Sequence, residues 1–403
     1  MKIGIVVWNL DLTGGTERQA LELAIHLKRM GHHVEVYCAY YDPERCFPEF
    51  IREFENIRYL EACHRVEITH RSRAVFYWDI LFRRSRALSK MISPDLDVLN
   101  CHEYTTFLSG VMYKKRTGVP VVGMLNDTPS FEGVYEPKDG PYKFPLSWAK
   151  RAVFAPAIKA IDTVVVLDHL NRNRLKKYLG LDATVVRSGA DLAKYMFQER
   201  TLHIDRINIL ANGNFFPWRR YEDLISALRI LADEGVAFHL NHIGTDAFSP
   251  AYAARIRRLV ARLGLVESVT FRGYVSEPLL LEIYSHSDIF VFPNFPQTWG
   301  LAVFEAMACG IPVIVNSGCG AAEVLADNET AIVVPPESPG DIARAILRLR
   351  DSPELFNKLS KNGRAFVEEN ISWELYASNM LETFSQSLTS RRGERRNRSR
   401  TVG

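Results

Sequence analysis

The sequence predicts an α/β protein of two doubly wound domains, each built on a parallel sheet with helices on both faces. Short apolar runs alternate with helical patterns along the chain, which is typical of parallel sheets. The length of 403 residues exceeds what one hydrophobic core usually serves, so we expect two domains. With 47% hydrophobic and 24% charged residues, the composition gives no indication of a disordered, collagenous or membrane-spanning chain.

The first domain is predicted to begin with a strand in IGIVVW, followed by a helix over 16–30 and a second strand at 34–38. Together these elements make one β-α-β unit. The opening residues lack the long apolar core and small-residue cleavage site of a signal peptide, so we expect them to form the first strand. The six cysteines show no metal-binding spacing, and we expect reduced thiols in a cytoplasmic protein.

A second series of strands begins with INILAN at 207–212 and continues to AIVV. The predicted parts of the chain are an N-terminal domain at 1–190, a linker at 191–206, a C-terminal domain at 207–372, a helix at 373–390 that can pack back on the first domain, and a basic disordered tail at 391–403. The stretch RRGERRNRSR in this tail holds six Arg and one Glu, so without it the formal charge of +3 becomes −2. A solvated end is the usual interpretation, and attraction to anionic lipid or nucleic acid is the alternative.

Two glycines after the first strand are the first candidate ligand contact. Gly14 and Gly15 precede a predicted capping box of Thr16 and Gln19, so backbone N–H groups and a helix N-terminus would face an anion. Ligands of doubly wound sheets bind at the carboxyl ends of the strands, so we expect the site in the cleft where the two sheets face each other. An ordinary turn would also need glycines here. The spacing is not GxGxxG, which argues against a dinucleotide.

In the second domain, Arg219 and Arg220 follow Pro217 at a loop-to-helix junction. A guanidinium at a helix start can bind a diphosphate bidentately, although two solvated arginines are the plainer alternative. Further on, Gly300 starts an apolar helix that contains Glu305. A carboxylate in apolar surroundings needs hydrogen-bond donors, and sugar hydroxyls would serve.

At these motifs the chain resembles the retaining glycosyltransferases of family 4, which have the GT-B fold of two facing Rossmann-like domains with the active site between them. The resemblance covers nearly the whole chain, and its motifs are GGTERQALELAIHLKRMGHHVEVY, SGAD, GNFFPWRRYEDLISAL, GYVSEPLLLEIYSHSDIFVFP and QTWGLAVFEAMACGIPVIV. It implies transfer of a hexose from a nucleotide-diphosphate sugar with retention at the anomeric carbon. It also implies no obligatory metal and no cofactor beyond the GDP- or UDP-linked co-substrate.

The resemblance assigns roles to individual residues. The family's last motif has two glutamates separated by seven residues; the second falls on Glu305, which would hold the ribose hydroxyls, and the first falls on Gln297. An amide at this position can still bind a sugar hydroxyl. The expected catalytic residues are Arg219, Gln297, Glu305 and His102; the diphosphate contacts are Gly14, Gly15, Asn214, Arg219, Arg220, Gly300 and Leu301; the nucleoside contacts are Tyr274, Val275 and Glu305; and Asn126 and Asp127 lie on the acceptor or sugar side.

Several polar positions depart from the family pattern. Asn214 stands where the family usually has Arg, and Arg219 stands where it has Lys, so Arg220 is the candidate to replace a missing cation. Asn126 and Asp127 occupy the place where a His often follows the fourth strand. His102 is then the remaining ring near the site, and a structural histidine is the alternative.

The acceptor is expected to be a lipid-linked saccharide or another glycan precursor. Residues 71–90 interleave six basic residues with aromatic and aliphatic ones, a pattern that suits peripheral contact with an anionic membrane, although a core helix is equally consistent. Residues 39–50 loosely resemble the mannosyltransferases of lipid-linked oligosaccharide assembly, which favours GDP-mannose and leaves a UDP-sugar open. We expect no nucleic-acid partner.

Three alternatives stay open. The first is a metal site at Asp95 and Asp97, which spell the DxD of a different glycosyltransferase fold but run directly into a strand. The second is a nucleotide-sugar epimerase of the same architecture. The third is a non-catalytic subunit that binds a sugar nucleotide and has lost activity through Asn214, Asn126 and Gln297.

Overall fold

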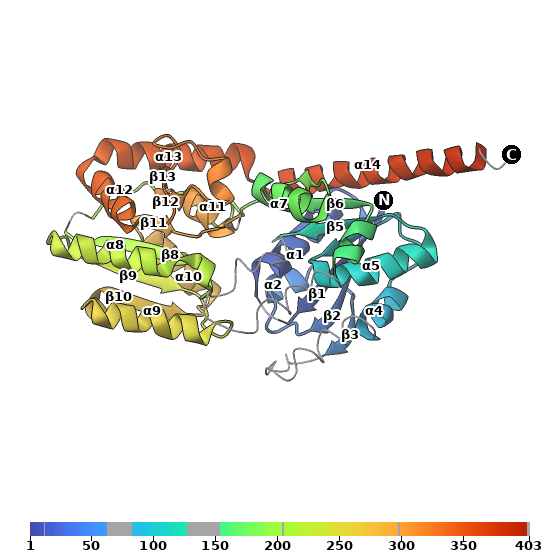
Figure 1. Ribbon diagram of the computed structural model, residues 1–403, viewed down its shortest axis with the longest axis horizontal. Helices are drawn as coiled ribbons and strands as arrows, with labels where there is room; N and C mark the ends of the chain where they lie inside the picture. The colour runs from blue at the N-terminus through green and yellow to red at the C-terminus, as the bar shows by residue number, and fades with distance from the viewer. Residues whose placement is uncertain (12, 63–82, 127–153, 204, 297–298, 401–403) are drawn as a thin grey trace. The chain divides into compact units, whose positions relative to one another are not determined.

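The computed structural model describes residues 1–11, 13–62, 83–126, 154–203, 205–296 and 299–400 (Figure 1). The chain divides into two compact units, each built on one sheet. The first unit holds the described residues up to Ser188 and the segment from Trp373 onward, and the second holds Gly189–Ser372. Both units are Rossmann-like, which confirms the predicted fold class.

The first unit has a seven-stranded, wholly parallel sheet with the order β3-β2-β1-β4-β5-β6-β7. Its strands are β1 (Lys2–Leu10), β2 (His33–Tyr41), β3 (Ile57–Ala62), β4 (Val98–His102), β5 (Val121–Leu125), β6 (Thr163–Val166) and β7 (Thr184–Val185). Its helices are α1 (Gly15–Arg29), α2 (Pro48–Ile51), α4 (Ser85–Met91), α5 (Tyr104–Thr117), α7 (His169–Leu179) and α14 (Trp373–Arg400). The strand order reverses between β1 and β4, so a crevice for a ligand is expected at their carboxyl ends.

The second unit has a six-stranded parallel sheet with the order β10-β9-β8-β11-β12-β13. Its strands are β8 (Ile207–Asn212), β9 (Phe238–Ile243), β10 (Val269–Gly273), β11 (Ile289–Phe292), β12 (Val313–Asn316) and β13 (Ile332–Val334). Its helices are η2 (Pro217–Arg219), α8 (Tyr221–Asp233), α9 (Pro250–Arg262), η3 (Val266–Ser268), α10 (Glu277–Ser285), α11 (Leu301–Ala308), η4 (Ala321–Glu323), α12 (Pro339–Asp351) and α13 (Pro353–Asn370). The order reverses here between β8 and β11.

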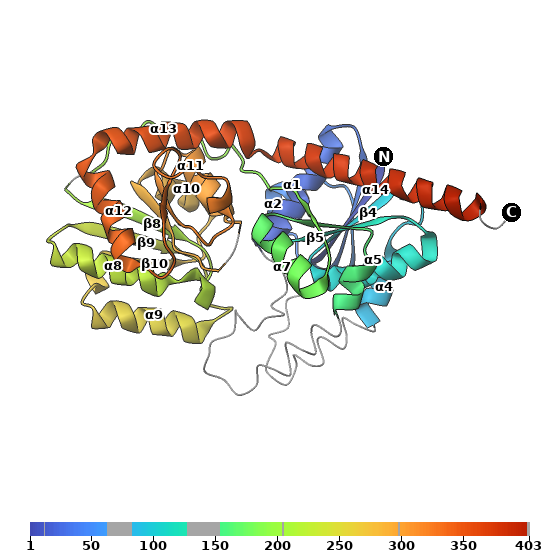
Figure 2. The same ribbon diagram turned by 45° about the horizontal axis from the view of Figure 1, so that its top comes forward.

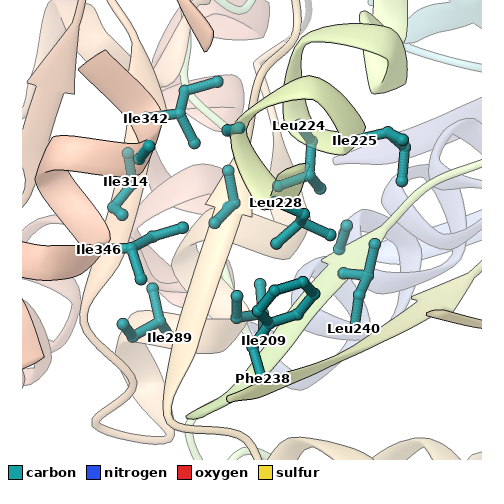
Figure 3. Close-up of a cluster of buried hydrophobic side chains, with 14 of the residues drawn as sticks. Ile209, Leu224, Ile225, Leu228, Phe238, Leu240, Ile289, Ile314, Ile342 and Ile346 are labelled. Carbon is teal, nitrogen blue, oxygen red and sulfur yellow. The ribbon is translucent and has the colours of Figure 1, made fainter. Parts of the chain in front are cut away.

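The central strands are apolar runs because both of their faces are covered. In the second unit, Ile209 and Ile289 from neighbouring strands pack against Leu228 of α8 and Ile346 of α12 (Figure 3). All four side chains are fully buried. Parallel strands with helices on both faces bury their side chains in this way, which explains why the sequence shows continuous apolar runs instead of alternation.

The C-terminal helix α14 belongs to the first unit and runs across α1 (Figure 2). Its residues Tyr376, Met380 and Phe384 are fully buried, and Glu374 bonds His26 of α1, with 3.1 Å between Oε1 and Nε2. The helix continues to Arg400, through most of the stretch 391–403 that was predicted to be a disordered tail. Arg is a good helix former and the stretch has no Pro, so a helix already nucleated by its buried part can propagate.

The membrane-facing segment predicted at 71–90 falls largely outside the described residues. Its end forms α4, in which Leu88 is fully buried. Within the described ranges, no helix combines the length and the apolar composition needed to cross a bilayer.

Candidate functional site

The loop that follows β8 carries the predicted diphosphate-binding residues. The side chain of Arg219 folds back against Gly213, where an added Cβ would lie 3.1 Å from the guanidinium carbon and 3.0 Å from Oη of Tyr221. A side chain here would force both groups to shift, and the φ of +155° is one that glycine adopts readily. The Tyr221 hydroxyl donates to the Gly213 carbonyl at 2.7 Å, which joins the end of β8 to the start of α8.

The two neighbouring arginines differ in their partners. The guanidinium of Arg220 binds Asp223, with 2.9 Å between Nε and Oδ2, and it binds Glu337 at 2.9 Å through Nη1. In contrast, Nε of Arg219 is buried without a hydrogen-bond partner in the described part of the chain. The Arg219 guanidinium lies over the ring of Phe292, 5.9 Å from its centroid. A cation that acids leave uncompensated is the one that can attract a ligand anion.

Asn214 makes a structural hydrogen bond. Its Oδ1 accepts from the backbone N–H of Thr245 at 3.0 Å, which ties the loop after β8 to the loop after β9. The two loops touch so closely that a Cβ on Gly244 would lie 2.2 Å from the Gly213 carbonyl oxygen. Asn214 therefore contributes to the shape of the loop, and it cannot restore the positive charge of an arginine.

A buried histidine beneath this loop was missed by the sequence analysis. His242 of β9 lies 4.3 Å from the ring of Tyr221 and 4.4 Å from that of Phe215, between ring centroids. Burial, reinforced by the charges of Arg219 and Arg257, lowers its pKa to about 3. Neither ring nitrogen has a partner among the described residues. The imidazole is therefore neutral at physiological pH and adds no positive charge beneath the loop.

Glu305 lies on α11, directly after the reversal of strand order. The helix begins at Gly300, whose φ of +82° and distance of 2.9 Å from a virtual Cβ to the Phe292 ring both require glycine. The Glu305 side chain is only 7% exposed. The hydroxyl of Tyr284 donates to Oε2 of Glu305 at 3.4 Å, and it accepts from Nδ2 of Asn212 at 3.0 Å.

Tyr284 and Asn212 are therefore two further residues of this site that the sequence analysis missed. Tyr284 comes from α10 and Asn212 from the end of β8, so three separate elements meet at the carboxylate. Burial and the charge of Glu305 raise the pKa of Tyr284 well above its usual value. The tyrosine thus stays a hydrogen-bond donor, and it compensates part of the cost of burying the carboxylate.

The structure brings the two motifs of the second unit together. The backbone N–H of Phe295 donates to the carbonyl of Trp218 at 2.8 Å. This hydrogen bond joins the segment after β11 to the loop that carries Arg219. Phe292 touches both motifs, because it packs against Arg219 and Gly300. Arg219 and Glu305 thus follow adjacent strands, β8 and β11, at the carboxyl edge of the sheet.

The remaining predicted residues of this unit are more peripheral. Leu301 is the first residue of α11 and is half-buried. Tyr274 is 71% exposed and Val275 is half-buried, directly after the edge strand β10. Tyr274 and Val275 thus lie at the carboxyl edge of the same sheet as Arg219 and Glu305. Gln297 lies outside the described residues.

In the first unit, His102 ends β4 and is fully buried. Nδ2 of Asn100 donates to the carbonyl of Val122 at 3.1 Å, so its Oδ1 accepts from Nε2 of His102 at 2.8 Å. The proton of the neutral ring is therefore on Nε2, and Nδ1 carries a buried lone pair without a partner among the described residues. Burial lowers the pKa of His102 to about 3, so it is a weak base.

The start of α1 differs from the predicted capping box. Gly14 is the N-cap and Gly15 is the first helical residue, so Thr16 lies inside the helix and cannot cap it. Its Oγ1 instead accepts from Nδ2 of Asn126 at 2.9 Å. Gln19 is buried, and its amide has no partner in the part of the chain that the structure describes. Asn126 therefore follows β5 directly and lies beside the glycine turn, while Asp127 lies outside the described residues.

The aspartates of the DxD sequence lie at the other edge of this sheet. Oδ2 of Asp97 accepts from the backbone N–H of Lys2 at 2.7 Å, at the amino ends of β1 and β4. The glycine turn follows the carboxyl end of β1, and His102 is the last residue of β4. Across the described ranges, no group of three or more His, Cys, Asp or Glu side chains is arranged to hold a metal ion.

Comparison with known families gives two matches that follow each other along the chain. The family described as "Glycosyltransferase Family 4" matches residues 13–194, and "Glycosyl transferases group 1" matches residues 196–366. Among curated proteins, a D-inositol 3-phosphate glycosyltransferase of Streptomyces bingchenggensis is 26% identical over 258 residues, or 60% of this chain and 56% of that protein. The chain thus aligns with about half the length of the first curated relatives that it matches.

Two solved structures share the fold over almost the whole chain. Sucrose-phosphate synthase of Thermosynechococcus elongatus has a TM-score of 0.78 at 20% identity and covers 96% of this chain and 99% of its own. Anabaena HepE, solved in complex with UDP-glucose, has a TM-score of 0.72 at 16% identity and covers 96% and 100%. At these sequence identities, the likeness shows a shared fold and nothing further.

Proposed function

Because the chain belongs to the family 4 glycosyltransferases with the GT-B fold, we propose that it transfers a hexose from a nucleotide-diphosphate sugar to an acceptor. One observation carries the proposal. Arg219, a cation without an acidic partner among the described residues, and Glu305, a buried carboxylate, follow adjacent strands at the point where the strand order reverses. A nucleotide sugar presents an anion and ribose hydroxyls, which are the groups these two side chains would bind.

Arg219 is the proposed diphosphate ligand. The charge on the departing diphosphate grows as the glycosidic bond breaks, so a fixed guanidinium stabilises the transition state more than the ground state. Arg220 is bound to Asp223 and Glu337, and it contributes little net charge to this step. The backbone turns at Gly300 and at Gly14 are the proposed additional contacts with phosphate oxygens.

Glu305 is the proposed ribose ligand. A carboxylate can accept from two hydroxyls at once, and the Tyr284 hydroxyl holds one of its oxygens. Tyr274 and Val275 are the proposed contacts with the base. A site with these groups would bind UDP or GDP, and the complex of Anabaena HepE with UDP-glucose supports a UDP-sugar as the first donor to test.

Retention and independence of metal ions form the finer part of the proposal. In front-face transfer, the leaving diphosphate takes the proton of the acceptor hydroxyl, so the protein supplies orientation and charge stabilisation and no nucleophile. Gln297 is proposed to orient the donor sugar through its amide. His102 cannot act as a cation with a pKa near 3, so its proposed role is to accept a hydrogen bond at Nδ1.

The proposed acceptor is a lipid-linked saccharide or another glycan precursor, with Asn126 and Asp127 on its side of the site. A phosphorylated cyclitol is a second candidate, because the curated relative from Streptomyces bingchenggensis is a D-inositol 3-phosphate glycosyltransferase. Peripheral contact with an anionic membrane through residues 71–90 belongs to the first of these acceptors.

A ligand screen followed by product analysis tests the function. Purified protein is melted with UDP, GDP, ADP and their sugars, because a ligand of the native state raises the melting temperature by mass action. The stabilising sugar nucleotide is then incubated with candidate acceptors, with and without EDTA. A glycosylated acceptor supports the proposal, whereas a changed donor sugar without acceptor indicates an epimerase. Binding without any turnover would indicate a non-catalytic subunit.

A further inference from the structure

Arg200 lies in the segment between β7 and β8, outside the sequence motifs. Within the described residues, its half-buried guanidinium donates four hydrogen bonds, and all of them go to backbone carbonyls. Nε binds the carbonyl of Cys309 at 3.0 Å, Nη1 binds those of Ser285 at 3.2 Å and Ser287 at 2.6 Å, and Nη2 binds that of Tyr284 at 3.1 Å.

Three of these carbonyls belong to the C-terminal ends of two helices, and the fourth, that of Ser287, lies just beyond α10. Tyr284 and Ser285 end α10, and Cys309 directly follows α11. The last carbonyls of a helix have no intrahelical partner and carry partial negative charge, so a cation there is favourable. The flat guanidinium has five N–H donors spread over three nitrogens, so it can bind both helix ends at once. A lysine has all of its donors on one nitrogen and cannot make the same set of hydrogen bonds.

The same two helices carry Tyr284 and Glu305, whose side chains meet. The Tyr284 hydroxyl lies 3.4 Å from Oε2 of Glu305, near the upper limit for a hydrogen bond. Arg200 binds the backbone of Tyr284 itself. It also binds Cys309, whose N–H donates to the Glu305 carbonyl at 3.1 Å. A small separation of the helices would therefore break the contact between tyrosine and carboxylate.

We propose that Arg200 is a positioning residue for donor binding, which joins the ends of α10 and α11 and so sets the geometry of Tyr284 and Glu305. The inference rests on the proposed role of Glu305 as the ribose ligand. Arg200 itself touches no substrate. Its effect on the reaction is through the orientation of the carboxylate.

Arg364 provides a matched control. Its Nη1 donates to the carbonyls of Ala308 at 2.8 Å and Tyr195 at 3.0 Å, so it also binds the end of α11. None of its hydrogen bonds in the described residues reaches α10. Arg364→Lys should therefore cost stability in the same place without changing the relation between the two helices.

The test compares Arg200→Lys, Arg364→Lys, Glu305→Gln and the double variant Arg200→Lys/Glu305→Gln in the full-length chain. Affinity for UDP and GDP is measured by calorimetry, together with the melting temperature and the KM for the donor. Arg200→Lys should weaken nucleotide binding about tenfold, which is about 1.4 kcal/mol. Arg364→Lys should lower the melting temperature while its affinity stays within about twofold of the parent.

The double variant decides whether Arg200 acts through Glu305. The two losses should not add, because a misplaced carboxylate and a missing one remove the same interaction. Additive losses, or parental affinity in Arg200→Lys, would overturn the proposal. Parental affinity in Glu305→Gln would instead remove Glu305 from the site, which is a failure of the proposed function.

A second variant keeps the proposal testable if Arg200→Lys does not fold. Tyr284→Phe removes the hydroxyl that contacts Glu305 and keeps the buried ring. It should reproduce the loss of nucleotide affinity. Parental affinity in Tyr284→Phe would overturn the proposal without any substitution at Arg200.

Discussion

Arg219 and Arg220 are neighbours in sequence, but only Arg220 is bound to acids, Asp223 and Glu337, while Nε of Arg219 is buried without a partner among the described residues. Arg220 has a left-handed backbone with φ of +53°, so consecutive side chains leave the chain in different directions. Acids therefore compensate the charge of Arg220, whereas in the described residues no acid forms an ion pair with Arg219.

Arg219→Ala should lower turnover by about 100- to 1,000-fold, because it removes a fixed cation from a leaving group whose charge grows in the transition state. Steady-state kinetics with the preferred donor measures the effect, and kcat should fall more than KM rises. Arg220→Ala should mainly lower the melting temperature. If Arg219→Ala retains parental turnover, another group holds the diphosphate.

Glu305→Gln should weaken nucleotide binding by about 1.5–3 kcal/mol, the range for a hydrogen bond to a charged group. A neutral amide cannot accept from two ribose hydroxyls as a carboxylate does. Calorimetry with UDP or GDP measures the loss. Glu282→Gln, at an exposed position of α10, is the control for the change of charge and should bind like the parent.

Substitutions at Gln297 test whether its amide orients the sugar. Gln297→Ala should reduce turnover by roughly 10- to 100-fold, the equivalent of about 1.4–2.8 kcal/mol. Gln297→Glu should stay within a few-fold of the parent if hydrogen-bond acceptance is all that matters. A large gain with Glu would mean that the parent is impaired here, and an unchanged rate with Ala would mean that Gln297 does not contact the sugar.

Acid should destabilise the fold through its buried histidines. Burial lowers the pKa values of His102 and His242 to about 3, below the value of 6.5 for an unfolded histidine. The unfolded chain therefore binds more protons between these values, and stability falls as the pH drops below 6.5. Each histidine should contribute about 1.4 kcal/mol per pH unit.

The variant His242→Phe isolates one of these contributions. Phenylalanine fills the space among Phe215, Tyr221 and Phe271 and does not titrate. Its unfolding free energy, measured by chemical denaturation at pH 7 and pH 5, should fall less on acidification than that of the parent. An identical fall in both proteins would show that His242 is not the titrating group.

The fold could be predicted because its signals are local. Buried parallel strands such as β8 and β11 are continuous apolar runs, and Glu305 was recognisable as an acid within an apolar helix. The partners of that acid could not be predicted. Tyr284 and Asn212 reach it from separate elements, and no spacing in the sequence encodes such a contact.

Other features could not be predicted because they depend on single residues or on contacts made only in the folded chain. The helix α1 begins at Gly15, which moves Thr16 from a capping position into the helix. The separate roles of Arg219 and Arg220 depend on Glu337, which lies in a remote loop and binds only one of them. The role inferred for Arg200 depends on two helix ends that only the folded chain brings together.

The return of α14 to the first unit determines how the chain can be divided. A fragment that ends at Ser188 would lack Tyr376, Met380 and Phe384 and would expose the face of α1 that they cover, so it should aggregate when expressed alone. Among the described residues, the second unit is one stretch, Gly189–Ser372, inserted between two parts of the first. A chimera that exchanges this stretch with that of a relative would transplant the whole unit that carries the proposed nucleotide site through two junctions.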